Sequence, residues 1–185
     1  MFPRLWKYAI NRVSRHCDRW TARRVRPLVR RGDHLLNIGS RDGRLDLLLR
    51  RDPGCEVVVD PGHLPLPFSD DRFDVVLLVS VLHHVDDPRT VLEEARRVSR
   101  RQVIVLEDVN STRWDRLVFR AFHRWIQTLP TPYRKWSPEQ WSQLAAEAGL
   151  REEWSGLVGR QMGYFAPRQI MFEWQKPVVK MRKAA

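Results

Sequence analysis

The chain has 185 residues, of which 43% are hydrophobic and 30% charged. This balance excludes an intrinsically disordered chain and predicts one globular domain with a substantial core. No apolar run approaches the roughly 20 residues that a membrane-spanning helix needs, and the first residues lack the uninterrupted apolar stretch of a signal peptide.

The net charge of +11 is unevenly distributed along the chain. Residues 1–31 hold ten Arg or Lys and one acid, Asp18, so this segment carries +9 of that charge. We therefore divide the chain into a basic arm over 1–29, a near-neutral domain over 30–176 and a small basic tail over 177–185. The two cysteines, Cys17 and Cys55, have no metal-site spacing. We expect both to be free thiols in a reducing cytoplasm.

Residues 4–25 predict an amphipathic helix in the basic arm. Apolar side chains recur at intervals of four and three residues and share one face: Trp6, Ile10, Val13, Cys17 and Trp20. Two interpretations stay open. The apolar face can pack on the domain while the arginines are solvated, or the helix can lie on an anionic membrane surface and hold the protein at its periphery. A nucleic-acid interface has little support, because no nucleic-acid-reading motif accompanies the charge.

A strand, a glycine loop, a helix and a second strand that ends in an acid follow the arm. Their expected bounds are His34–Ile38, Gly39–Gly43, Arg44–Arg51 and Glu56–Val59, with Asp60 as the acid. Gly39 and Gly43 would let the backbone turn tightly and approach a ligand. Asp60 follows Gly43 by 17 residues, near the roughly 20-residue interval at which an acid reaches ribose hydroxyls in dinucleotide-binding folds. The pattern predicts a cradle for a nucleotide-like ligand.

The rest of the chain alternates strands with helices. Strands are expected over the apolar runs Phe73–Ser80, Gln102–Leu106, Arg151–Leu157 and Gln169–Trp174. Helices are expected over Arg89–Ser99, Thr112–Thr128 and 137–149; Asp87 and Ser137 cap the first and the last, and Gly149 ends the last. This alternation predicts an α/β fold, a Rossmann-like open, mostly parallel sheet with helices on both faces.

Four stretches carry a family resemblance: LLNIGSRDGRL, VVVD, LPFSDDRFDVVLLVSVLHHVDDPRTVLEEARRVS and VIVLED. The third is the most specific, with its E-x-x-R-V at Glu94–Val98. Together they resemble the class I S-adenosylmethionine-dependent methyltransferases of the type 11 family over about residues 30–175. The resemblance implies S-adenosyl-L-methionine as cofactor, no metal, and methyl transfer to a small-molecule or lipid-like acceptor. A catalytically silent protein of this fold, acting as a binding or scaffolding partner, is the alternative.

The resemblance also implies roles for individual residues. The loop that holds the methionine end of the cofactor would contain Asn37, Gly39, Ser40 and Gly43. The ribose hydroxyls would be bound by Asp60, and the other side of the cofactor would be lined by Ser80 and Val81. His83 would face the substrate and is the candidate general base, unless it only packs at the strand end. Glu107 and Asp108 are either substrate-side acids or solvated loop acids.

The chain departs from the family pattern at the first loop. Asn37 replaces the usual acid and removes a charge that would favour the cofactor's ammonium group. Arg41 replaces the middle glycine and adds positive charge beside a cationic ligand.

A second departure shortens the sheet. Only Pro61–Pro65 separates Asp60 from Leu66, where the family has a further helix and strand, so the sheet should lack one edge strand-helix unit. The new edge would need a cover, and pairing with a second chain in a dimer is one solution. The register also has an alternative, in which Val57–Asp60 is the edge strand and Asp46 binds the ribose. We favour Asp60, because Arg44–Arg51 has the pattern of a helix.

Overall fold

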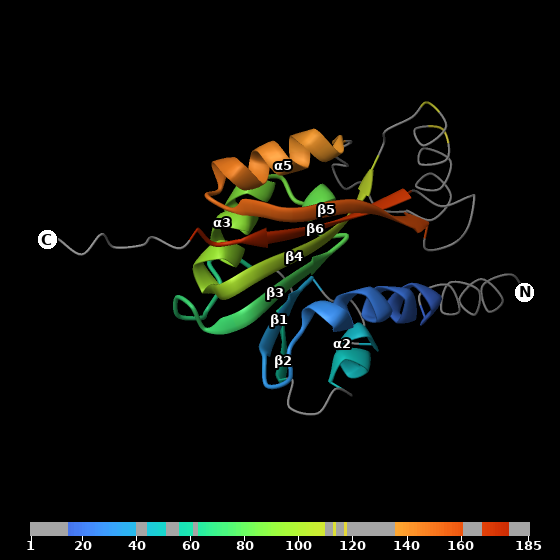
Figure 1. Ribbon diagram of the computed structural model, residues 1–185. Helices are drawn as coiled ribbons and strands as arrows, with labels where there is room; N and C mark the ends of the chain where they lie inside the picture. Colours follow the sequence, from blue (N-terminus) through green and yellow to red (C-terminus); the bar gives the residue numbers. More distant parts are fainter. Residues whose placement is uncertain are drawn as a thin grey trace, which may run out of the picture.

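Six strands form one sheet in the order β2-β1-β3-β4-β6-β5 (Figure 1). The computed structural model describes residues 15–39, 44–50, 56–60, 63–109, 113, 117, 136–160 and 168–177. The strands are β1 (His34–Ile38), β2 (Glu56–Asp60), β3 (Phe73–Val79), β4 (Ser99–Val109), β5 (Arg151–Arg160) and β6 (Arg168–Gln175). All neighbouring pairs are parallel except the two that involve β6. The predicted open, mostly parallel α/β sheet is confirmed.

The described helices lie close to the residues that the sequence predicts to be helical. They are a helix over residues 15–25, α2 (Arg44–Leu49), α3 (Pro88–Val98) and α5 (Pro138–Glu147), with short 3-10 turns η1 (Arg26–Leu28) and η2 (Leu82–His84). Asp87 caps α3 by accepting from two backbone N–H groups, and Ser137 forms a capping box with Gln140 at the start of α5. The helix predicted over Thr112–Thr128 lies outside the described residues, except for 113 and 117, which are helical.

Helices cover both faces of the sheet, and each face has its own apolar core (Figure 1). On one face, α3 and α5 pack on the sheet through buried side chains that include Leu92, Val98 and Trp141. On the other face, the helix over 15–25 and α2 contribute Val25 and Leu49. Strands β1, β3 and β4 supply residues to both cores, as expected of strands buried on two sides.

The described part of the basic arm packs on the domain. Val25 is fully buried, and the Trp20 ring contacts the same core under the Arg24 guanidinium, whose Cζ lies 3.5 Å from the ring centroid. Arg24 also donates to the carbonyl of Val158 in β5, at 2.9 Å. The arginines at 15, 19 and 23 are exposed. The packing interpretation is therefore confirmed for residues 15–25, while membrane binding by this exposed face stays a prediction.

No helix in the described ranges is long and apolar enough to cross a membrane.

Strand β2 lies directly beside β1, with Asp60 opposite Ile38. Arg44–Leu49 is helical, as the favoured register expects, and the assignment of the ribose acid to Asp60 stays a prediction. Within the described residues, β2 pairs with β1 alone and forms one edge of the sheet. This agrees with the predicted loss of one edge strand-helix unit.

The spacing of Glu94 and Arg97 in the E-x-x-R-V motif has a structural explanation. The Arg97 guanidinium donates to the Glu94 carboxylate and to the backbone carbonyls of Leu66 and Phe68, while Glu94 accepts from the Leu66 N–H. These bonds join α3 to the loop that leads into β3. The Arg97 hydrogen bond is the largest cause of a lowered Glu94 pKa, with smaller help from the Leu66 N–H.

Candidate functional site

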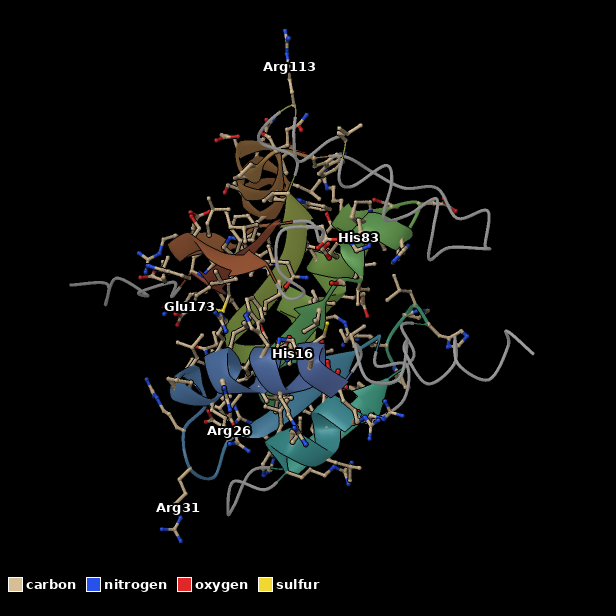
Figure 2. The ribbon with its side chains drawn as sticks, turned by 90° about the vertical axis from the view of Figure 1, so that its right-hand side faces the viewer. His16, Arg26, Arg31, His83, Arg113 and Glu173 are labelled. Carbon is tan, nitrogen blue, oxygen red and sulfur yellow. The ribbon has the colours of Figure 1, made fainter. Side chains whose placement is uncertain are left out.

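The candidate site lies where the chain reverses direction across the sheet. From β1 the chain proceeds to β2 on one side, and β3 then pairs with β1 on the other side. Ligands of open α/β sheets bind at such a switch point, outside the carboxyl ends of the strands. Figure 2 views the molecule from the side on which the parallel strands end.

Gly39 and Val81 meet across this switch point. Gly39 follows β1 with a φ of +81°, and a Cβ added there would lie 2.4 Å from the Val81 Cγ2. Both the backbone angle and the close approach therefore require glycine. The two residues were predicted to line opposite sides of the cofactor, and the structure brings them into contact.

Ser80 has a left-handed backbone between β3 and Val81. Its φ is 53°, an uncommon value for a residue with a side chain. The Ser80 N–H donates to the carbonyl of Leu106 at 2.8 Å, which holds the turn against β4. Held strain of this kind is concentrated at functional sites. Ser80 and Val81 thus occupy the end of β3, as predicted.

Glu107 organises the turn that follows. Its side chain is fully buried, and its Oε1 accepts from the N–H groups of Val81 at 3.0 Å and Leu82 at 2.7 Å. Its Oε2 lies 2.5 Å from the Nδ1 of His83, which is 2% exposed. The solvated alternative for Glu107 is therefore wrong. A carboxylate accepts only, so the Nδ1 carries the proton of this bond.

Gln169, at the start of β6, belongs to the site and was missed by the sequence analysis. Its Nε2 donates to the Asp108 Oδ1 at 3.1 Å and approaches the Ser80 Oγ at 3.4 Å. The opposite orientation of the Gln169 amide would place its carbonyl oxygen against the Asp108 carboxylate, where the two acceptors would repel. The Gln169 Nε2 therefore faces Asp108. The partner residues are 61 and 89 positions away, and no local pattern marks them.

The helix over 15–25 borders the same edge. The pKa of the Cys17 thiol is raised to about 12. Burial is the largest cause, and the nearby carboxylates of Asp18 and Asp108 make smaller contributions in the same direction. Cys17 is thus an unreactive thiol close to the end of β4. In Figure 2, His16 of this helix and His83 of η2 both lie on the face toward the viewer.

Near the end of β1, Asn37 meets Asp46 of α2. The Asn37 Nδ2 donates to the Asp46 Oδ1 at 2.5 Å, and the two residues are 1% and 3% exposed. Because Asn37 replaces the usual acid, the sequence predicts that this position lacks the carboxylate that would favour an ammonium group. The structure places one there, on α2 instead of β1.

The arrangement fits S-adenosylmethionine on several counts. The backbone at Gly39 approaches Val81 too closely for any side chain, a carboxylate lies beside Asn37 on α2, and the backbone of Asp60 ends β2 next to β1. Ser40, Arg41 and Gly43 lie outside the described residues. Within the described part of the chain, no group of three or more His, Cys, Asp or Glu is placed to hold a metal ion.

Comparison with known proteins gives a family match over the same segment. Residues 21–106 match the model of a methyltransferase domain. A stretch of 48 residues is 40% identical to an uncharacterized protein of Methanocaldococcus jannaschii. That stretch is 26% of this chain and only 23% of the relative's length, so it covers a small part of either protein.

Two solved structures share the fold over nearly their whole length. One is a complex of the Haloferax volcanii methyltransferase activator Trm112 with a candidate methyltransferase, with a TM-score of 0.69, 15% identity, and coverage of 92% of this chain and 96% of the other. The second is a Thermotoga maritima SAM-dependent methyltransferase, a candidate histamine N-methyltransferase, with a TM-score of 0.66, 19% identity, and coverage of 89% and 92%. These identities establish the fold alone.

Proposed function

We propose that the chain binds S-adenosylmethionine and transfers its methyl group to a small-molecule acceptor, because residues 21–106 match the model of a methyltransferase domain. The contact of Gly39 with Val81 at the switch point carries this proposal, because it forms a glycine-dependent cradle where such sheets bind ligands. The bound cofactor supplies a methyl group on a sulfonium.

The chain's own residues would mainly position the two reactants, because methyl transfer is an in-line displacement. Gly39, with Ser40 and Gly43 of the same loop, would bind the methionine end, and Asp60 would bind the ribose hydroxyls. Ser80 and Val81 would form the opposite wall. The placement of Gly39, Asp60 and Val81 after or at the ends of β1, β2 and β3 supports the roles of these residues.

His83 would act as the general base if the acceptor must lose a proton. Glu107 holds the Nδ1 proton, so the Nε2 is the nitrogen with the lone pair, and a neighbouring carboxylate stabilises the imidazolium that forms. His83 is buried beneath the site, so the acceptor would have to be small or to enter beside η2. A lipid-like acceptor is supported only by the exposed arginines of the arm, which could hold the protein at an anionic membrane surface.

A partner protein is the second candidate. Strand β2 is an edge of the described sheet, and its unpaired backbone groups could take a strand from a second chain. The Haloferax volcanii neighbour was solved with an activator protein. We propose that a second chain pairs here, and sedimentation velocity over a range of concentrations tests self-association. A single monomeric species at all concentrations would remove the dimer.

Calorimetric titration of the full chain tests the enzymatic proposal. We expect S-adenosylmethionine and S-adenosylhomocysteine to bind with micromolar affinity, and ATP, which shares only the adenosine, to bind much more weakly. A folded protein that binds neither sulfur compound would favour the catalytically silent scaffold. Asn37 and Arg41 are the sequence features that favour that second outcome.

A further inference from the structure

Two neighbouring residues of helix α2 have the opposite burial to the one expected from their polarity. Leu47 is 64% exposed, whereas Asp46 is 3% exposed and faces β1. A buried carboxylate costs free energy unless it is well compensated, and an exposed leucine gains none. Simple amphipathicity would place these two side chains the other way round. The inward position of Asp46 therefore calls for an explanation other than packing.

The Asn37 amide is part of that explanation. Its Nδ2 donates to the Asp46 Oδ1 at 2.5 Å, across nine positions of sequence. Two acids at positions 37 and 46 would repel, and one would be driven to its neutral form. An amide at 37 and an acid at 46 avoid this conflict and leave one negative charge at the base of the loop.

The location of this charge points to a ligand. Asn37 precedes Ile38, the last residue of β1, and Gly39 begins the loop at the switch point. We infer that Asp46, acting through the Asn37 amide, is a positioning residue that selects the cationic amino-acid end of the ligand. The inference rests on the proposed function and reverses the conclusion that Asn37 removes the charge from the site.

A comparison of two ligands isolates this role. S-adenosylhomocysteine and 5′-methylthioadenosine share the adenosine and a thioether, but only the former has an ammonium group. We expect Asp46→Asn to weaken S-adenosylhomocysteine binding by about tenfold or more and to leave methylthioadenosine binding within about twofold, because a charged group contributes mainly to its ionic partner. Calorimetry measures both affinities, and thermal unfolding shows that the variant is folded.

The exchanged pair Asn37→Asp with Asp46→Asn is the second variant. It keeps one acid and one amide in contact, so we expect it to restore S-adenosylhomocysteine affinity to within about threefold of the unaltered chain. The loss and recovery of S-adenosylhomocysteine affinity at constant methylthioadenosine affinity is the readout that a merely structural pair would not give.

Three results would overturn the inference. An equal loss of both ligands in Asp46→Asn would show that the pair only shapes the loop. Unchanged affinity for both would show that the charge has no role. If the unaltered chain binds neither ligand, the proposed function fails and the inference fails with it, which separates that outcome from the first two.

Discussion

The Nδ1 of His83 lies 2.5 Å from the Oε2 of Glu107, and both side chains are buried. The second carboxylate oxygen of Glu107 accepts from two backbone N–H groups of the same turn. One acid thus fixes both the backbone of η2 and the tautomer of its histidine. Glu107 is therefore the group that would prepare His83 for the proposed proton transfer.

Replacing Glu107 with Gln should release the histidine. An amide accepts at one atom only, so either the turn or the Nδ1 proton loses its acceptor. We expect a loss of about 1–3 kcal/mol in the free energy of unfolding and an upfield shift of the His83 Nδ1 proton in NMR spectra. Asp108→Asn is the matched control, since Asp108 is the next residue and accepts from the Gln169 Nε2. A His83 spectrum that Glu107→Gln leaves unchanged would refute this assignment.

Gly39→Ala tests the cradle. We expect it to weaken S-adenosylhomocysteine binding at least about tenfold, because the new Cβ would lie 2.4 Å from the Val81 Cγ2. The positive φ at this position would cost alanine about 1–3 kcal/mol in addition. Gly32→Ala is an informative control. Gly32 has a similar φ of +87°, and a Cβ there meets nothing within 4 Å. It should destabilise the fold without changing affinity, and an equal loss of affinity in both variants would contradict the cradle.

The ion pair of Glu94 and Arg97 predicts a pH dependence of stability. The pKa of Glu94 is lowered in the folded chain from its ordinary 4.5, so the pair's contribution is complete above that value and is lost as the pH falls through the lower folded pKa. Glu94→Gln should cost about 1–3 kcal/mol at pH 7 and reduce the slope of unfolding free energy with pH below about 4.5. Denaturant unfolding from pH 7 to 3 measures both.

Glu93→Gln is the control for that measurement. Glu93 pairs with Arg89 on the surface of the same helix, with side chains 45% and 52% exposed. Exposed pairs contribute about 0–1 kcal/mol, so this variant should have nearly the unaltered pH profile. If both variants lose the same stability, the loop contacts of Arg97 have no special weight.

The helix over 15–25 should contribute to stability through its buried side only. Val25→Ala removes two methyl groups from a fully buried side chain and should cost about 1–2.5 kcal/mol. Arg23→Ala, on the exposed side, should change the free energy of unfolding by less than about 0.5 kcal/mol. Chemical denaturation compares the two. Similar small effects would show that this helix is detachable from the domain.

The sequence predicted the strands and the described helix ends because their signals are local. Apolar runs rich in Val, Ile and Leu mark buried strands, and the caps at Asp87 and Ser137 are readable within four residues. The sequence also predicted Gly39 and Val81 as neighbours of one site, through the family pattern. Strand β4 proved longer than predicted, since Glu107–Val109 continue the ladder to β6 and Ser99 pairs with Phe73 of β3.

The site's polar pairs could not be predicted in the same way. Asn37 and Asp46 are nine positions apart, His83 and Glu107 are 24 apart, and Gln169 is 61 from Asp108. Each pair depends on how elements stack in space, and the residue types alone fit solvated positions equally well. Glu107 fitted either a substrate-side acid or a solvated loop acid in the sequence, and only its burial excludes the solvated alternative.

The most direct test of the account is titration with S-adenosylhomocysteine of three chains: unaltered, Asp60→Ala and Glu153→Ala. Asp60 ends β2 beside β1, while Glu153 lies on β5 at the other end of the sheet. We predict micromolar binding that Asp60→Ala reduces at least about a hundredfold, since two hydrogen bonds to a charged group are lost, and that Glu153→Ala leaves unchanged. No binding by a folded, unaltered chain, or equal binding by all three, would contradict a cofactor site at the switch point.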